Sequence, residues 1–168
     1  MKYIFCQPFH AHSHVKESLL KAIEQYPDSS IYQDSGDTIS KTDWIQTVNN
    51  NSPLPYKKEL SIHLSDHCVR VLNHPKILLK EIWFQQYKRN DTHTWHTHED
   101  AHFTNVYFVE LPDKNAKTQI KDMDGSLIEY EAKEGDILTF PGFLYHQSPL
   151  IETDTRKTIV SFNLTICS

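Results

Sequence analysis

The hydrophobic pattern of this chain changes its period near residue 80, and this change most constrains the fold. Before it, apolar residues recur every three or four positions at 15–26 and 57–72, which predicts two amphipathic helices. Proline follows closely after each stretch and ends the helical pattern. The segment 28–56 is rich in Ser, Asp, Asn and Pro, so we expect loop there, with a short turn near 42–45.

After residue 80, β-branched and aromatic stretches alternate with turn residues, which is typical of strands. The expected strands are 78–87, 103–111, 117–122, 126–131, 137–140 and 156–166, with a hairpin turn at 123–125. Short strands after two helices predict a mainly β fold with flanking helices, a jelly-roll barrel. Because 168 residues is the length of one domain, we expect a single domain over 1–168, in which 1–77 supports a core at 78–168.

Composition excludes several classes of protein. The net charge is −5 and the basic residues are scattered, so we expect no direct nucleic-acid binding. Cys6, Cys68 and Cys167 lie far apart without a CxxC pair, which argues against a disulfide framework and for a reducing, cytoplasmic setting. No segment has the length of a signal peptide or membrane span, so no membrane contact is expected. The sequence does not determine the oligomeric state, and a homodimer is compatible with it.

The segment 95–100 (WHTHED) carries the clearest chemical signal. On an extended strand, residues two apart point to one side, so His96, His98 and Asp100 would share a face. His146 lies in a separate segment that could fold over them. Two histidines and one carboxylate leave coordination positions open, an arrangement diagnostic of non-haem Fe(II) oxygenases. The sequence therefore predicts a metal site.

The strand that begins at Arg156 suggests a second element of this site. Thr158, Val160 and Phe162 follow Arg156 at intervals of two residues, so their side chains lie on the same face of the strand. If Val160 and Phe162 face the barrel interior, Arg156 and Thr158 would face it too. A buried arginine needs a partner, and its planar fork matches a co-substrate carboxylate, with the Thr158 hydroxyl adding a hydrogen bond. The alternative is an exposed arginine paired with a neighbouring acid.

Five sequence blocks follow one another along the second half of the chain: 83–87 (WFQQY), 95–98 (WHTH), 104–112 (TNVYFVELP), 134–146 (EGDILTFPGFLYH) and 156–163 (RKTIVSFN). In this order they resemble the 2-oxoglutarate/Fe(II)-dependent oxygenases of marine bacteria and their phages, and 42–44 (TDW) is similar to an upstream motif of the same group. The resemblance covers roughly residues 80 to 166. It implies a double-stranded β-helix fold, iron and 2-oxoglutarate as cofactors, and a host-cytoplasmic setting if the protein is viral.

The identity of the metal ligands stays open between two sets. The superfamily pattern HxD or HxE favours His98, Asp100 and His146, which we take as the expected set. The closer resemblance falls on His96 and His98, so His96 is the rival ligand, and three imidazoles would be similar to a cupin-type site. The residue left out would orient the others from outside the coordination sphere.

Two tyrosines are further candidates for cofactor binding. Tyr87 and Tyr107 lie on strands expected to line the same cavity, and the resemblance implies that one donates a hydrogen bond to the co-substrate carboxylate. Either tyrosine could instead pack in the core with a satisfied hydroxyl.

The remaining histidines are expected to lie outside the metal site. His10, His12 and His14 alternate near the N-terminus, where no further ligand is in view, and we interpret them as surface residues. The histidines at 63, 67 and 74 are expected to be solvated. His93 and His102 flank the metal segment and could line the substrate opening.

Together these features predict a 2-oxoglutarate-dependent dioxygenase, a hydroxylase that oxidises an organic or peptidyl substrate with O₂ and releases succinate and CO₂. The first alternative is a cupin-like metal enzyme without 2-oxoglutarate, which a three-histidine site with an outward Arg156 would favour. The second is a non-catalytic jelly-roll module for binding or for attachment to a virion.

Overall fold

The computed structural model describes residues 4–27, 32–49 and 55–168. In chain order its elements are β1 (Phe5–Pro8), α1 (His12–Glu24), β2 (Tyr32–Asp34), β3 (Asp37–Ile39), β4 (Lys41–Thr42), α2 (Trp44–Val48), α3 (Pro55–Leu72), β5 (Ile77–Tyr87), β6 (His93–His96), β7 (Phe103–Glu110), the 3₁₀ turn η1 (Lys114–Ala116), β8 (Gln119–Ile120), β9 (Asp136–Pro141), β10 (His146–Ser148) and β11 (Lys157–Ile166).

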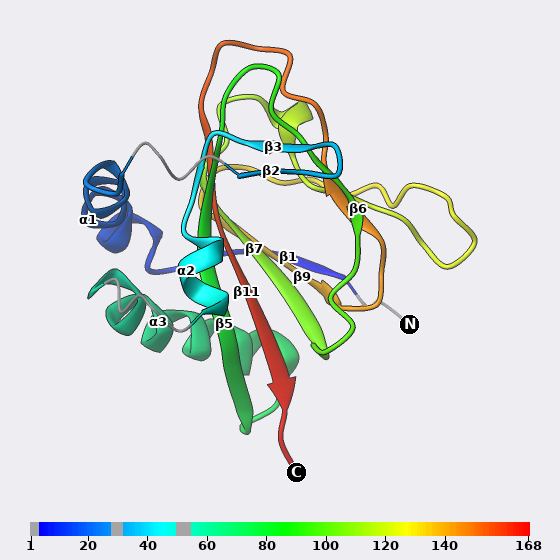
Figure 1. The fold of residues 1–168 in the computed structure, drawn as a ribbon. Helices are drawn as coiled ribbons and strands as arrows, with labels where there is room; N and C mark the ends of the chain where they lie inside the picture. Colours follow the sequence, from blue (N-terminus) through cyan, green and yellow to red (C-terminus); the bar gives the residue numbers. More distant parts are fainter. Residues whose placement is uncertain (1–3, 28–31, 50–54) are drawn as a thin grey trace.

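Two antiparallel sheets face each other. Within the described residues, the major sheet has six strands in the order β1-β9-β7-β11-β5-β4, and the minor sheet has three in the order β6-β10-β8. The short hairpin β2-β3 lies near one end of the sheets, and α1 and α3 lie against the major sheet on the side away from β6 (Figure 1).

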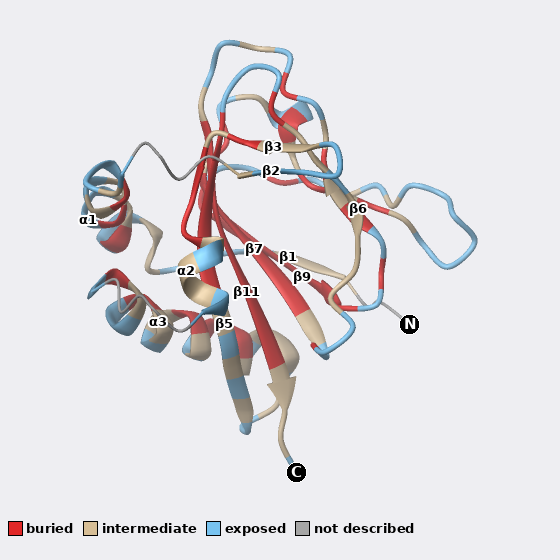
Figure 2. Cartoon of the chain, in the orientation of Figure 1, coloured by how far each residue is buried: buried red, intermediate tan, exposed pale blue. Residues whose placement is uncertain are grey.

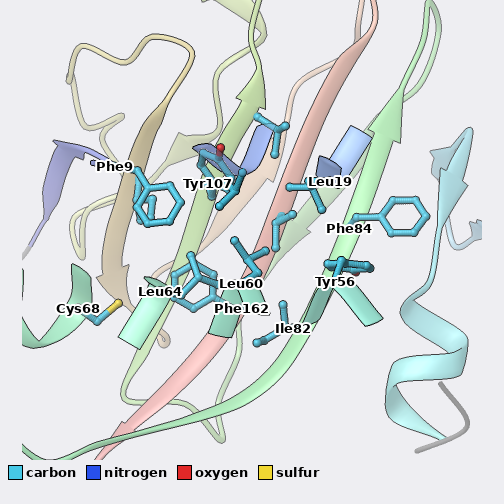
Figure 3. Packing of buried hydrophobic residues seen from close by; sticks show 14 of the residues in the cluster. Phe9, Leu19, Tyr56, Leu60, Leu64, Cys68, Ile82, Phe84, Tyr107 and Phe162 are labelled. Atoms are coloured by element: carbon cyan, nitrogen blue, oxygen red, sulfur yellow. The ribbon is translucent and has the colours of Figure 1, made fainter. Parts of the chain in front are cut away.

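The helices bury one apolar face against the major sheet. Val15, Leu19 and Ile23 of α1 are four residues apart and buried, as the helical period requires. α3 contributes a similar row that includes Leu60 and Leu64. These side chains pack on Phe84, Tyr107 and Phe162 from the sheet (Figure 3).

A second apolar core lies between the two sheets. It includes Phe108, Leu138, Phe140 and Ile159 from the major sheet and Ile120 from the minor sheet. The central strands of the major sheet are therefore buried on both faces (Figure 2). This double burial explains why their sequences are nearly continuous apolar runs rather than alternating ones.

Most of the expected architecture is confirmed. The chain is mainly β with flanking helices, and both expected helices and the strands at β5, β7, β9 and β11 are present. The expected hairpin turn at 123–125 is present, because an antiparallel bridge joins Lys121 to Leu127 and the Ile128 N–H donates to the Ile120 carbonyl at 2.9 Å. Its two strands are shorter than expected, and in the described structure Gln119–Ile120 is the one regular strand between 117 and 131. The expected strands do not include β1, β2, β3, β4 or β10.

Helix α3 differs from expectation at His67, which is 2% exposed rather than solvated. Its ring packs edge-on against Phe9 at a centroid distance of 5.8 Å. As for membrane contact, no helix in the described parts of the chain is long and apolar enough to span a bilayer.

Candidate metal centre

Three histidines converge between the two sheets. One ring nitrogen from each of His96, His98 and His146 lies within 4.8 Å of the others. His96 and His146 are direct partners across β6 and β10, and their ring centroids are 4.2 Å apart. The His98 ring stacks at 5.1 Å from the His146 ring. The minor sheet thus supplies two of the ligands, and the loop after β6 supplies the third.

Backbone carbonyls select the tautomer of two of these imidazoles. Nδ1 of His96 lies 2.7 Å from the Thr94 carbonyl oxygen, and Nδ1 of His146 lies 3.0 Å from the Leu144 carbonyl oxygen. Because a carbonyl can only accept, each Nδ1 donates its proton and each Nε2 keeps a lone pair. This arrangement orients a metal-ligating histidine in known metal sites.

Burial also keeps the cluster unprotonated. The pKa of His98 is lowered to about 4, mainly by burial and further by the neighbouring His96. The pKa of His146 lies well below its ordinary value for the same reasons. The rings are therefore neutral near pH 7, which is the form that binds a metal ion.

Gly142 holds the loop that carries His98. The His98 backbone N–H donates to the Gly142 carbonyl at 2.8 Å, and the Gly142 N–H donates to the His102 carbonyl at 3.2 Å. A Cβ at Gly142 would lie 2.4 Å from the Ala101 carbonyl oxygen and 2.6 Å from that of His98. Only glycine permits this close approach, so the sequence Pro141-Gly142 determines where His98 sits.

Asp100 lies outside the cluster. Its side chain is exposed in the turn after His98, and its backbone carbonyl accepts a hydrogen bond from Lys80 at 2.6 Å. The chain leaves the extended conformation after His96, so the two-residue alternation on which the expected ligand set depended ends before Asp100. The rival set, with His96 in place of Asp100, is the one whose ligand atoms the structure brings together.

The cavity beside the histidines is narrow, with a volume of about 20 Å³. Residues from both sheets line it, among them Trp83, Gln85, Tyr87, His93, Val106, Ser148, Ile159 and Ser161. His102, the other histidine expected near the opening, is instead exposed and accepts a hydrogen bond from the Ile166 N–H at 3.0 Å.

Lys157 places a buried cation beside this cavity. Its side chain is 1% exposed, its Nζ donates to the Ser148 hydroxyl at 2.8 Å, and it lies 4.9 Å from the centroid of the Tyr87 ring. No carboxylate of the described residues lies within 4 Å of this ammonium. Burial lowers the pKa of Lys157 to about 7, so the amine is only partly protonated near pH 7, and an anion bound beside it would favour the charged ammonium.

Arg156 points to the other face of β11. Its guanidinium forms a bidentate pair with Glu110 at 2.9 and 2.8 Å, and Thr158 donates a hydrogen bond to the same carboxylate. Arg156 and Thr158 do share a face of the strand with Val160 and Phe162, as expected, but this face packs against the helices. The expectation that Arg156 and Thr158 point into the cavity is therefore wrong. Their neighbour Lys157 lies on the cavity side with Ile159 and Ser161.

The two candidate tyrosines separate in the same way. Tyr87 lines the cavity, and its hydroxyl contacts the side chains of Ser148 and Gln85. Tyr107 packs in the helix-side core (Figure 3), where its hydroxyl lies 2.7 Å from Nδ1 of His12. Tyr107 therefore belongs to the core rather than to the cavity.

The hairpin β2-β3 covers the cavity at His93, a contact that sequence reasoning missed. Asp37 accepts hydrogen bonds from the Thr94 N–H and hydroxyl at 2.7 Å each, and its other oxygen lies 3.5 Å from Nε2 of His93. The His93 ring stacks on His96 at 3.9 Å. Asp37 lies in a segment expected to be loop, where no pattern in the sequence linked it to the histidines.

A buried carboxylate, Asp43, holds in place the segment that packs on the cavity-lining Trp83. Asp43 is 0% exposed and accepts hydrogen bonds from the Phe84 N–H at 2.8 Å and the Tyr56 hydroxyl at 3.0 Å, with Lys57 at 2.9 Å. It precedes Trp44, whose ring packs on Trp83 at 4.7 Å. Trp83 in turn lies 5.7 Å from His98.

Comparisons with known proteins identify the fold. No protein-family model and no curated protein matches the sequence. Solved structures do match. A 2OG-Fe(II) oxygenase family oxidoreductase from Burkholderia pseudomallei aligns with a TM-score of 0.75 at 9% identity, over 97% of this chain and 85% of that one. The chain has the double-stranded β-helix fold of these oxygenases.

Two further structures agree with this assignment. HygX from Streptomyces hygroscopicus, solved with nickel and 2-oxoglutarate bound, aligns with a TM-score of 0.68 at 11% identity over 98% of this chain and 83% of that one. The viral collagen prolyl hydroxylase of Paramecium Bursaria Chlorella virus-1 aligns with a TM-score of 0.58 at 10% identity, over 99% and 97%. At these identities the likeness concerns the fold alone.

Proposed function

We propose that this protein is an iron(II)- and 2-oxoglutarate-dependent oxygenase that hydroxylates an organic or peptidyl substrate. The observation that carries the proposal is the buried ammonium of Lys157 beside the three-histidine cluster. A cation in this position matches a dicarboxylate that also reaches the metal. The structural likeness to proteins solved with 2-oxoglutarate, and the sequence resemblance to marine bacterial and phage oxygenases, support the same cofactors.

The side chains present fit an iron ion with an imidazole set. His96, His98 and His146 would hold it, since imidazole is a ligand suited to iron and three protein ligands leave positions open for other groups. Iron with 2-oxoglutarate supplies the oxidation of the substrate by O₂, with release of succinate and CO₂. Asp100 would remain a solvent-exposed residue.

The other cavity residues would bind and orient the co-substrate. Lys157 would pair with its distal carboxylate, and the Tyr87 hydroxyl and Ser148 would complete the hydrogen bonds around that group. Trp83, Val106 and Ile159 give the cavity apolar walls that exclude water. Three free cysteines fit a reducing, cytoplasmic setting for this chemistry.

Turnover without the primary substrate tests this proposal. The purified chain, loaded anaerobically with Fe(II) and mixed with 2-oxoglutarate, O₂ and ascorbate as the two-electron reductant in place of the substrate, should form succinate in amounts that match the iron-dependent O₂ consumption. His146→Ala should abolish this reaction, whereas Glu152→Gln, an exposed loop substitution, should not. Succinate formation that does not depend on His146 would overturn the assignment.

A cupin-like metal enzyme without 2-oxoglutarate is the second candidate. The three-histidine set, the outward Arg156 and the narrow cavity of about 20 Å³ favour it, because 2-oxoglutarate needs the lining side chains to move apart. This candidate leaves the burial of Lys157 without a counter-ion, and for that reason we rank it second. It predicts that O₂ consumption with an added substrate proceeds equally well without 2-oxoglutarate.

A further inference from the structure

His14, Glu59 and His63 bring three metal-binding side chains together on the surface of the helical layer. One ligand atom from each lies within 4.8 Å of the others. His14 belongs to α1, whereas Glu59 and His63 belong to α3, and these two helices lie together on one side of the major sheet (Figure 1). The three-histidine cavity lies on the opposite face of that sheet, so the two clusters are separate.

The spacing within α3 suits a shared ligand. Glu59 and His63 are four residues apart, so their side chains lie on the same face of the helix, one turn apart. Ligands at this spacing bind one metal ion from a single helix in the HExxH motif. His14 approaches from the neighbouring helix, with its ring centroid 5.8 Å from that of His63 and the two rings inclined at 74°.

Other interactions do not occupy these three side chains. Within the described parts of the chain, none of them forms a side-chain hydrogen bond or an ion pair. His14 and Glu59 are exposed and His63 is half-buried, so an ion can reach them without any opening of the fold. Ligands that converge without a partner of their own are available to a metal ion.

We propose that this cluster binds one divalent transition-metal ion of the zinc class and joins α1 to α3. Two imidazole nitrogens and one carboxylate oxygen form a known three-ligand set for Zn²⁺, with water at the fourth position. Val15 and Leu19 of α1 belong to the same buried core as Leu60 of α3, so an ion held by both helices would stabilise their packing. This inference does not depend on the proposed oxygenase function.

Zinc binding to a chain with a disabled central cavity tests the proposal. In the His146→Ala background, Zn²⁺ is titrated by calorimetry and its effect on the melting temperature is measured. We expect one Zn²⁺ per chain and a rise of about 5–10 °C at a Zn²⁺ concentration about 100 times Kd. Adding His14→Ala, Glu59→Gln or His63→Ala should weaken binding about tenfold or more and remove the rise.

Matched substitutions elsewhere keep the test specific. His10→Ala and Glu152→Gln change an exposed histidine and an exposed glutamate outside the cluster, and both should leave zinc binding and the melting shift unchanged. If His146→Ala does not fold, His98→Ala provides an equivalent background. Zinc affinity that persists in all three cluster variants, or the absence of binding in the background chain, would overturn the proposal.

Discussion

The Lys157 ammonium lies 2.8 Å from the Ser148 hydroxyl oxygen, and this hydroxyl is its hydrogen-bond partner in the described structure. A fully buried cation that rests on a neutral group destabilises the chain unless an anion joins it. The contact is therefore costly for the folded state alone, and we interpret it as part of a ligand site. Its consequences can be measured with and without the ligand.

The metal-free chain should become more stable as the pH rises from 7 to 8.5. Burial lowers the pKa of Lys157 to about 7, whereas an unfolded lysine titrates near 10.4. Between these values the unfolded chain binds more protons, so the free energy of unfolding increases with pH, by up to about 1.4 kcal/mol per unit. Urea unfolding at both pH values measures it.

The ionisation of cysteine thiols limits this test to pH values below about 8.5, and a Lys157 variant serves as its control. Burial raises the pKa of Cys6 and Cys68 to about 12, an effect of opposite sign that begins where unfolded thiols ionise, near pH 8.5. Lys157→Met should be more stable than the parent at pH 7 and should lose the increase with pH. An equal slope in Lys157→Met would show that the ammonium is not its source.

Substitution of the candidate ligands should separate the histidine set from the carboxylate. His96→Ala, His98→Ala and His146→Ala should each lower Fe(II) affinity by more than the roughly 10 to 100-fold expected for a residue outside the coordination sphere. Asp100→Ala should leave it within about threefold of the parent, because the Asp100 side chain is exposed. Competition against a chromophoric chelator measures these affinities. A loss of Fe(II) affinity in Asp100→Ala as large as in the histidine variants would show that Asp100 is a metal ligand.

Gly142→Ala should weaken metal binding although Gly142 is not itself a metal ligand. The added methyl group must displace the backbone of Ala101 and His98, which moves the His98 ring, so Fe(II) affinity should fall about 10 to 100-fold. Gly125→Ala is the matched control, because its φ of +85° strains an alanine while nothing lies within 4 Å of the new Cβ. It should lose stability and keep its iron affinity; equal iron affinities in the two variants would contradict the role of Gly142.

Asp43→Ala should destabilise the chain by about 3–5 kcal/mol, since it removes one partner of a buried ion pair and leaves two hydrogen-bond donors unsatisfied. Asp66→Ala, at an exposed position of α3, should change stability by about 0.5 kcal/mol or less. Urea unfolding at pH 7 compares the two. A loss in Asp43→Ala no larger than in the control would show that the Asp43 network is dispensable.

The sequence predicts the layers of this fold better than the contents of its cavity. Helical periodicity located α1 and α3, and apolar runs located the central strands. Both faces of β11 are buried, however, so alternation could not tell which face meets the histidines. That ambiguity made Arg156 the expected carboxylate partner, although the adjacent Lys157 lies beside the cavity.

The ligand set shows a similar limit. The order of the motifs identified the histidines, but the choice between His96 and Asp100 depended on where the extended conformation ends. Contacts between distant segments, such as Asp37 with Thr94 or His14 with Glu59, arise from the packing of elements. No local pattern encodes them.

Anaerobic titration of the Fe(II)-loaded chain with 2-oxoglutarate tests the central claim most directly. The weak visible charge-transfer band of the iron complex reports binding in the parent, in Lys157→Met and in Arg156→Met. Loss of one member of a buried charge pair costs about 2–5 kcal/mol, so Lys157→Met should bind 2-oxoglutarate about 30-fold more weakly or worse, with Arg156→Met within about threefold of the parent. Parent-like binding by Lys157→Met, or no band in the parent, would contradict the account.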